Sequence, residues 1–321
     1  MDKKLYYRGK AGTYFYNFTE LFAYLITYRP TPQNITYSKR IHYGNGKQQY
    51  INTYCRNDLK EIKKPLFIYI HGGGWVSGIT DMRNTYIQNF AKLGFFTASI
   101  SYTYAPDKVF PAQIQEICSA VDCLFDSKEK YNIDTDNIIL AGESAGGYYI
   151  TYLASIAADK TLADKINVNF RNNENFKIKA MINHCGCVNL NRLLNPGLPQ
   201  SKFPDMKMMA TSYLGMKYDE ARRFLETDEG KLTYPQVNPA FPPTFFTTAA
   251  KDFLRFEGYD MMEEYKQNNI PFDTFEGTGI IQFHAWTIVT IVKKGRECLN
   301  KTVEFIMKYL PDYKEFFEKY N

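Results

Sequence analysis

The chain has 321 residues, of which 45% are hydrophobic and 23% charged, as in ordinary globular proteins and unlike disordered or fibrous chains. Its 39 basic and 34 acidic residues give a net charge of +5. Basic clusters such as Lys60 to Lys64 are short and indicate solvated surface, so nucleic-acid binding is not expected.

The N-terminal residues 1–8 lack the apolar segment and small-residue cleavage site of a secretion signal, so we expect a cytoplasmic protein. The uncharged stretch 277–292 is shorter than the roughly 20 residues that a membrane span needs, so none is predicted. Six scattered cysteines favour reduced thiols over a disulfide framework. The pair Cys185 and Cys187 has too few further ligands nearby for a metal site, and we predict neither a metal nor an organic cofactor.

Two β-like segments, 35–43 and 48–55, flank Gly44-Asn45-Gly46 and predict an antiparallel hairpin. Apolar β-like runs and helical runs then alternate, as in a mostly parallel sheet that helices cover on both faces. In chain order the expected elements are strand 66–70, helix 81–93, strand 95–101, helix 112–131, strand 137–141, helix 145–158, strand 178–183, strand 244–250, helix 257–269, strand 271–276 and helix 286–310. Residues 1–34 and 186–236 do not fit this sheet.

The first strand of the alternating region runs into a glycine-rich loop. Residues 71–75 read His-Gly-Gly-Gly-Trp. Three consecutive glycines expose backbone N–H groups that no side chain shields, which suits stabilisation of an oxyanion during acyl transfer. The alternatives are a flexible loop or a phosphate cradle. A phosphate loop would carry Lys and then Ser or Thr after the glycines, where Trp75 and Val76 stand.

A second glycine-rich turn follows the apolar run 138–141. Residues 142–147 read Gly-Glu-Ser-Ala-Gly-Gly and precede a helix-like stretch. In a G-x-S-x-G turn the small flanking residues permit a strained strand-to-helix conformation. Ser144 would then project near a helix N-terminus, which favours negative charge. The motif alone is weak evidence, but together with the glycine-rich loop it predicts a nucleophilic serine.

These two motifs resemble the hormone-sensitive-lipase-like group of α/β-hydrolase esterases, in which an HGGG loop precedes a GDSAGG or GESAGG elbow. Residues 101–107 and 110–112 are similar to the family's Asp-Tyr-Arg-Leu-Ala-Pro-Glu and Phe-Pro-Ala segments, with Thr103 in place of the arginine. The resemblance implies an α/β-hydrolase fold with a mostly parallel central sheet, flanking helices and a helical cap. Its expected division is a core at 35–185 and 237–321 and a cap at 1–34 and 186–236.

A nucleophilic serine needs a base, and the chain offers four histidines. His42 precedes the hydrolase strands, His71 belongs to the glycine loop, and His184 closes an apolar strand, where a structural role is more common. His284 follows the expected strand 271–276 and precedes the C-terminal helix, which is where the family carries its base.

The carboxylate that orients the base is expected at the end of a strand, between the serine and the histidine in sequence. Asp252 follows the expected strand 244–250, and residues 252–255 resemble the family's Asp-Pro-Leu-Arg apart from the proline. Glu257 and Asp260 are rivals. Both fall on the amphipathic helix that follows, where a charge usually lies on the solvated face.

The working hypothesis is a serine esterase that forms an acyl-enzyme intermediate, and the resemblance implies short-chain, acetyl-type esters as substrates. The expected triad is Ser144, Asp252 and His284. The backbone N–H groups expected to bind the oxyanion belong to Gly73, Gly74 and Ala145. Methionine and aromatic side chains adapt to apolar ligands, so the candidate residues of an acyl pocket are Trp75, Phe203, Met206, Met209 and Tyr213. The alternative is that such residues of the cap only hold the cap together.

Two other functions stay open. An amide hydrolase of arylformamidase type would use the same triad. A non-catalytic ligand-binding protein could also use the fold, although the retained His284 disfavours it. The expected partner is a small-molecule ester, and an edge strand could support a homodimer.

Overall fold

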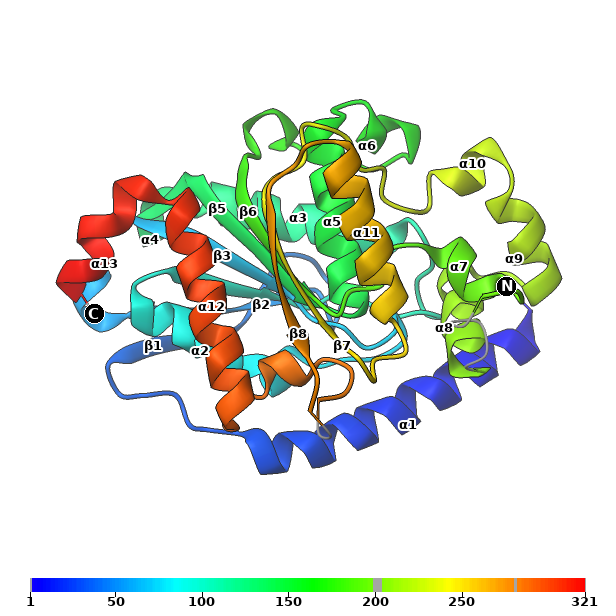
Figure 1. Cartoon of the computed structure of the whole chain (residues 1–321), viewed down its shortest axis with the longest axis horizontal. Coiled ribbons are helices and arrows are strands. Elements are labelled where there is room, and N and C mark those ends of the chain that lie inside the picture. Colours follow the sequence, from blue (N-terminus) through cyan, green and yellow to red (C-terminus); the bar gives the residue numbers. More distant parts are fainter. Residues whose placement is uncertain (1, 199–203, 280–281, 321) are drawn as a thin grey trace.

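The computed structural model describes residues 2–198, 204–279 and 282–320, and an eight-stranded sheet lies at its centre (Figure 1). The strands are β1 (Ile35–His42), β2 (Tyr50–Arg56), β3 (Lys64–Ile70), β4 (Phe96–Ile100), β5 (Ile133–Glu143), β6 (Ile178–His184), β7 (Thr244–Ala249) and β8 (Phe272–Gly277). Their order is β1-β2-β4-β3-β5-β6-β7-β8. β2 pairs antiparallel with β1 and β4, and the other neighbours are parallel, so the predicted hairpin and mostly parallel sheet are confirmed.

Helices cover both faces of this sheet. The α-helices of the described residues are α1 (Lys3–Thr27), α2 (Asn84–Leu93), α3 (Ala112–Asp126), α4 (Lys128–Tyr131), α5 (Ala145–Ala158), α6 (Leu162–Lys165), α7 (Leu190–Leu194), α8 (Pro204–Leu214), α9 (Tyr218–Leu225), α10 (Asp228–Lys231), α11 (Arg255–Gln267), α12 (Lys293–Tyr309) and α13 (Lys314–Tyr320). Side chains alternate along β3, as a strand buried on both faces requires. Leu66, Ile68 and Ile70 join a core with α3 and α5. Phe67 and Tyr69 join a second core with α2 and α12.

One of the expected helices is divided, and another starts well after its predicted first residue. The helix expected over 112–131 is divided at Ser127 into α3 and α4. The helix expected over 286–310 is wrong in its first turns, because α12 starts only after residues 287–292. Those six residues are all β-branched, and β-branched side chains lose rotamer freedom in a helix, so the helix forms where the run ends.

α1 lies outside the sheet and runs along one side of the molecule, where it packs against α8 (Figure 1). Two glycines permit this close contact. A Cβ added to Gly9 would lie 2.9 Å from Oγ of Ser212, and one added to Gly12 would lie 2.6 Å from Cε of Met208. The two segments that do not fit the sheet therefore contact each other, although they are far apart in sequence.

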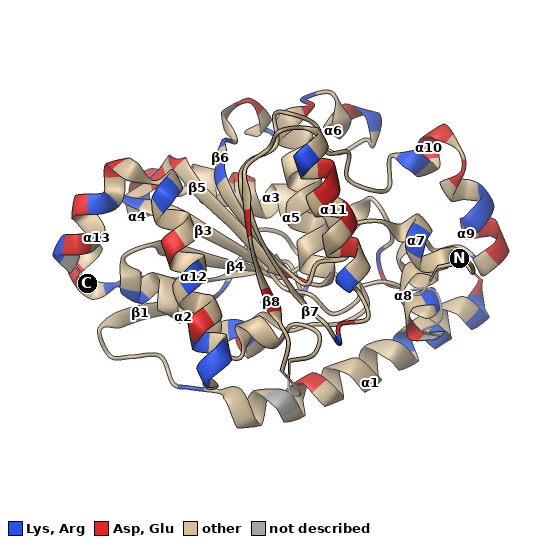
Figure 2. Ribbon diagram, viewed as in Figure 1, with Lys and Arg blue, Asp and Glu red and all other residues tan. Residues whose placement is uncertain are grey.

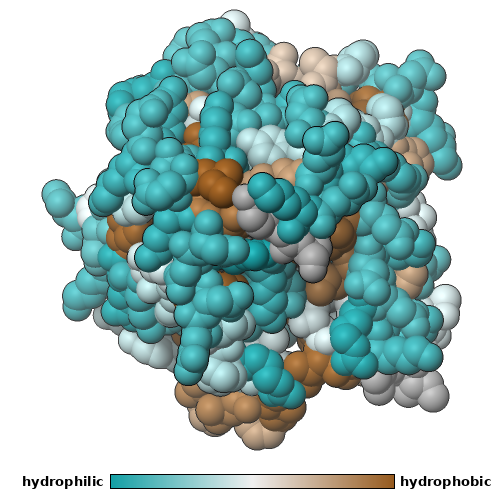
Figure 3. Space-filling model, turned by 90° about the vertical axis from the view of Figure 1, so that its left-hand side faces the viewer, coloured by the Kyte–Doolittle hydropathy of each residue, from teal (hydrophilic) through white to brown (hydrophobic). Residues whose placement is uncertain are grey.

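Charged residues cover much of the surface of the helices, and apolar side chains gather at one edge of the molecule (Figure 2 and Figure 3). Figure 2 shows charged residues on the outer helices and few on the strands. Figure 3 shows one largely hydrophilic face, with apolar side chains gathered along its lower edge, where α1 lies. In the ranges that the structure describes, none of the helices combines the length and the apolar character that crossing a bilayer would take.

Candidate active site

Ser144 stands at the sharp turn between β5 and α5. Its φ of 55° and ψ of −121° form a conformation that L-residues rarely adopt. The Ser144 N–H donates to the His184 carbonyl at 3.0 Å, and the Ser144 carbonyl accepts from the Cys187 N–H at 3.1 Å. A Cβ added to Gly146 would collide with the Ile70 carbonyl oxygen on β3. The last glycine of the G-x-S-x-G motif is therefore required by the close approach of α5 to β3.

The glycine-rich loop after β3 brings its backbone to the same place. Gly73 and Gly74 have φ values of 119° and 60°, in the left-handed region that favours glycine. The Gly73 carbonyl accepts the Ser77 N–H at 3.0 Å and closes a tight turn. Both glycines, together with Ala145, line the cavity that Ser144 also lines. The three residues predicted to bind an oxyanion are thus brought around one cavity.

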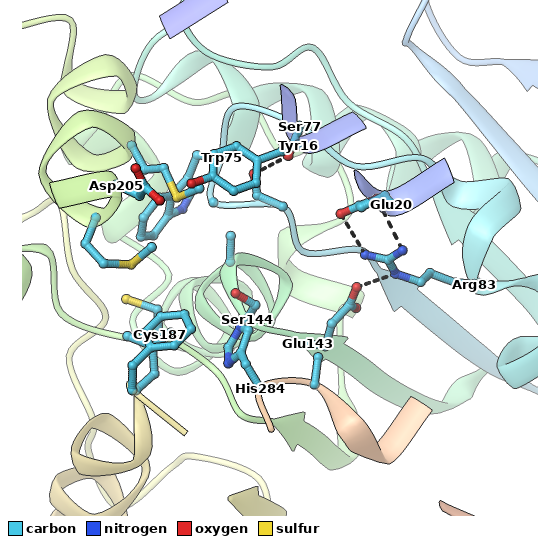
Figure 4. Close-up of a pocket in the computed structure, with 18 residues that line it drawn as sticks. Tyr16, Glu20, Trp75, Ser77, Arg83, Glu143, Ser144, Cys187, Asp205 and His284 are labelled. Atoms are coloured by element: carbon cyan, nitrogen blue, oxygen red, sulfur yellow. Dashed lines mark hydrogen bonds and ion pairs between the residues drawn. The ribbon is translucent and has the colours of Figure 1, made fainter. Parts of the chain in front are cut away.

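His284 and Asp252 form a contact pair. Nδ1 of His284 lies 3.0 Å and 3.1 Å from the two carboxylate oxygens of Asp252. Asp252 is fully buried and also accepts the Leu254 N–H at 2.8 Å. Burial raises the pKa of Asp252, but the charge and hydrogen bond of His284 outweigh it, and the net pKa lies below its usual value. His284 and Ser144 line the same cavity, and Figure 4 shows both side chains projecting into it.

The Cys185 thiol lies beside the same carboxylate. Its Sγ, a carboxylate oxygen of Asp252 and a ring nitrogen of His284 lie within 4.8 Å of one another. Burial and the negative charge of Asp252 raise the pKa of this thiol well above its usual value, so the thiol stays protonated and can donate to the carboxylate. Because Asp252 already accepts from His284, the cluster fits a hydrogen-bonded acid–base pair better than a metal site. Sequence reasoning considered Cys185 only as a possible metal ligand.

An ion cluster borders the cavity beyond Ser144 (Figure 4). Glu143, the variable residue of the elbow, is buried, and its Oε1 lies 2.5 Å from Nε of Arg83. Arg83 also lies 3.2 Å from Oε1 of Glu20 on α1, and the Tyr69 hydroxyl donates to Glu143 at 2.5 Å. Burial raises the pKa of Glu143, but Arg83 and Tyr69 together hold it below its usual value. Arg83 and Glu20 lie in no motif, so the sequence carried no signal for them.

The cavity in front of Ser144 has a volume of about 330 Å³. Its lining includes the predicted residues Trp75, Met206 and Met209, and Phe253 and Leu254 extend the apolar wall. It also includes Tyr16, Glu20 and Asp205, which sequence reasoning missed. The cavity lining at Ser144 therefore combines apolar and polar side chains.

Two predicted pocket residues need separate comment. Tyr213 is fully buried and is not among the residues that line the cavity; it stacks on Trp75 with ring centroids 5.3 Å apart and supports the wall from behind. Its assignment to the lining is wrong, because residue type does not tell which layer of a packed aromatic group faces the ligand. Phe203 lies outside the described residues.

Two of the discounted histidines are buried in the core. His184 contacts the Tyr86 hydroxyl at 2.6 Å and the Thr247 hydroxyl at 3.0 Å. His71 stacks on Tyr102 with ring centroids 4.5 Å apart. Burial lowers the pKa of both imidazoles to about 4, so both are neutral at physiological pH. These surroundings fit structural roles.

The prediction for Glu257 is wrong. Its side chain is fully buried on the core side of α11, where the carboxylate accepts the N–H groups of Val188 at 3.3 Å and Asn189 at 3.0 Å. Burial raises its pKa to about 7. Asp260 is half exposed and lies 2.8 Å from Arg192, as expected for a charge on the outer face.

A comparison with models of protein families matches residues 53–254 to BD-FAE. The chain belongs to the BD-FAE family. The part matched to BD-FAE contains the glycine-rich loop, the elbow and Asp252, and His284 lies beyond it.

Several curated relatives of this BD-FAE chain carry esterase names. An esterase of Gibberella moniliformis is 23% identical over 235 residues, which cover 72% of this chain and 70% of the relative. Esterase LipC of Mycobacterium tuberculosis is 29% identical over 122 residues, which cover 38% of this chain. Alignments with several such relatives are partial, and the one with LipC spans 30% of that protein.

Solved structures match nearly the whole BD-FAE chain. Esterase B of Lactobacillus rhamnosis has a TM-score of 0.76 at 18% identity, with 98% of both chains covered. The esterase of Pyrobaculum calidifontis has a TM-score of 0.69 at 21% identity and covers 96% of this chain and 93% of its own. The agreement shows that the chain has the α/β-hydrolase fold predicted from its sequence.

Proposed function

We propose that this chain is a serine carboxylesterase that cleaves short-chain acyl esters through an acyl-enzyme intermediate. The observation that carries the proposal is the contact pair of His284 and Asp252 at the cavity that Ser144 lines. Membership of the BD-FAE family and the esterase names of its relatives support it. The HGGG loop and GESAGG elbow further support a place in the hormone-sensitive-lipase-like group.

In the proposed reaction, Nε2 of His284 takes the Ser144 proton as the hydroxyl oxygen attacks the ester carbonyl carbon. Asp252 accepts from Nδ1 and so fixes the tautomer that leaves Nε2 basic. The alcohol then leaves with the proton that His284 returns. Water attacks the acyl-enzyme with His284 again as base, which releases the acid and restores Ser144.

The oxyanion of each tetrahedral intermediate would accept from the N–H groups of Gly73, Gly74 and Ala145. Their positions on two tight turns fix these donors before the reaction starts, so little reorganisation is needed when the charge develops. Each donor is worth roughly 3 kcal/mol of transition-state stabilisation. The α5 N-terminus lies directly behind Ser144 and favours the same negative charge.

The cavity limits the proposed substrate. A volume of about 330 Å³ is at the small end of the usual range for ligand sites, and the apolar side chains of the lining suit a short acyl chain. We assign residues 1–34 and 186–236 to a cap, because α1 and α8 supply Tyr16, Met206 and Met209 to the lining. One solved structure of Lactobacillus rhamnosis esterase B is described as inhibited by a tributyrin phosphonate, which supports testing butyryl-sized groups.

The test is hydrolysis of p-nitrophenyl esters from acetate to laurate by wild type, Ser144→Ala and Ser119→Ala. Ser119 lies on α3 and is the matched serine control, because its hydroxyl is hydrogen-bonded to Gln115 of the same helix. We expect turnover that falls with acyl length, a loss of at least about 10⁴-fold in Ser144→Ala and normal activity in Ser119→Ala. A tributyrin-like phosphonate should label wild type and not Ser144→Ala.

Near-normal turnover by Ser144→Ala would overturn the assignment of the nucleophile. If the phosphonate labels Ser144 and the protein cleaves a formyl anilide but no ester, the amide-hydrolase hypothesis would replace the esterase hypothesis. If Ser144 is not labelled and neither esters nor the formyl anilide are cleaved, the remaining hypothesis is the non-catalytic ligand-binding protein.

A further inference from the structure

We propose that the outer face of α1 docks the protein onto an anionic lipid surface. Among the described residues, nine of the eleven exposed large apolar side chains belong to α1 or to Tyr28 at its C-terminal end. They are Tyr7, Tyr14, Phe15, Phe18, Leu21, Phe22, Leu25, Ile26 and Tyr28. Phe18 is 72% exposed, and contiguous apolar surface of this kind marks an interaction site in soluble proteins.

These side chains form one face, which we call the α1 outer face. At 100° per residue they span about 160° of the helix circumference. The opposite side of α1 contacts the protein: Gly9 and Thr13 are buried, and Tyr16 and Glu20 line the cavity. The outer face therefore points away from the molecule, and Figure 3 shows apolar side chains at that edge.

The charges around the α1 outer face suit anionic headgroups. Lys3, Lys4 and Arg8 are exposed in the first turns of α1, and Figure 2 shows basic residues gathered at that end. The two acidic residues of the segment 2–27 are both engaged, since Asp2 lies 3.3 Å from Nζ of Lys217 and Glu20 contacts Arg83. Basic residues near a membrane are attracted to anionic lipids, while the apolar face inserts between the headgroups.

The shape and composition of the α1 outer face favour lipid over a second copy of the chain. The spacing of Tyr14, Phe18, Leu21 and Leu25 would fit a helix–helix seam. Phe15 and Phe22 widen the face well beyond such a seam, and a wide apolar face suits insertion into an interface plane. Six of its nine side chains are Tyr or Phe, and tyrosine is among the residues enriched where membrane meets water.

Docking through this face would also place the cavity close to the lipid. Tyr16 and Glu20 line the cavity and alternate along α1 with the exposed Phe15 and Phe18. Apolar esters dissolved in the lipid would then have a short path to Ser144. This last step rests on the proposed esterase function, whereas the docking itself does not.

The first experiment is co-sedimentation of the full chain with vesicles of phosphatidylcholine alone or with phosphatidylserine added. We expect binding to the mixed vesicles, and about tenfold weaker binding by the triple variant Phe15→Ser, Phe18→Ser, Phe22→Ser. Tyr259→Ser is the matched control, since Tyr259 is an exposed aromatic residue on α11. Ser144→Ala should bind like wild type, so docking can be scored even if the esterase proposal fails.

The charge variant Lys3→Gln, Lys4→Gln, Arg8→Gln should lose most of the preference for phosphatidylserine. This variant leaves the apolar face intact. It tests the proposal if circular dichroism shows that the triple serine variant is misfolded. Turnover of a water-soluble p-nitrophenyl acetate should be unchanged in both variants. Wild type that stays in solution with both vesicle types would overturn the proposal. A different result would assign the α1 outer face to a second copy of the chain: wild type is a dimer in light scattering, the triple serine variant is a monomer, and wild type does not bind vesicles.

Discussion

Asp252 is held by more than its histidine. Its carboxylate accepts from His284 Nδ1, from the Leu254 N–H and, as the burial and pKa of Cys185 indicate, from a protonated thiol. A carboxylate in a dry site needs several donors to stay ionised, because burial alone favours its neutral form. Under the proposed function Cys185 is a positioning residue, which acts on His284 through Asp252.

For Cys185 we predict that Cys185→Ala lowers kcat about three- to tenfold and moves the acidic limb of the pH–kcat profile upward. Without the thiol, the pKa of Asp252 rises and the carboxylate orients His284 less well. Cys185→Ser should restore most of the activity, since a hydroxyl is a better donor than a thiol. Cys118→Ala, which removes another buried thiol on α3, should leave the pH profile in place. Equal losses in the Ala and Ser variants would contradict a hydrogen-bonding role.

The residues predicted from sequence are those that short motifs mark. Ser144 and the glycines of the loop have backbone conformations that require small residues at or beside them, so the residue types in the sequence indicate these conformations. His284 and Asp252 were predicted from their order along the chain and from the resemblance to the esterase family, and the structure brings the two side chains into contact. Glu257 was misjudged, because helical spacing defines a face of α11 but does not tell what packs on it.

At the scale of elements, Glu257 joins α11 to the segment that leads into α7. Its carboxylate accepts two N–H groups there, so α7 is tied to the core by a group whose pKa is raised to about 7. The usual value is 4.5, so the folded protein binds more protons than the unfolded chain between these two values. The stability that this group contributes is full below about pH 4.5 and is lost as the pH rises through 7.

We therefore predict that Glu257→Gln removes this loss. Glutamine keeps an acceptor oxygen but no charge, so the variant should gain stability relative to wild type between pH 5 and pH 8, on the order of 3 kcal/mol. Urea unfolding at several pH values measures the difference. Glu263→Gln, on the exposed side of α11, should follow wild type. A constant difference between Glu257→Gln and wild type would show that the carboxylate does not titrate in this range.

The elements of the sheet were predicted better than their connections. Apolar runs of five to eight residues indicate buried strands, and β3 and β6 follow such runs closely. The start of α12 and the division at Ser127 depend on local competition between helix and turn, which periodicity does not measure. The position of α1 was not predictable, because it depends on contacts with α8, far along the chain.

At the scale of the whole molecule, buried groups of opposite kinds set how stability depends on pH. His71 and His184 lie in the core, with pKa values lowered by burial from 6.5 to about 4. The unfolded chain therefore binds more protons than the folded protein between these values, and each histidine makes stability fall as the pH falls from about 6.5 to 4. Glu257 acts in the opposite direction between about 4.5 and 7.

Near pH 5.5 the two histidines bind about two more protons in the unfolded chain than in the folded protein, and Glu257 binds about one fewer. The unfolded chain therefore binds about one more proton in total. We predict that the free energy of unfolding falls by about 1.4 kcal/mol for each pH unit from these groups as the pH drops through this range. Asp252 and Glu143, whose pKa values are lowered, act in the same direction below it. In His184→Gln the slope should nearly vanish, whereas His42→Gln, at an exposed position on β1, should keep it. Urea midpoints at pH 4.5 and 6.5 test this, and an unchanged slope in His184→Gln would mean that His184 is already protonated in the folded protein.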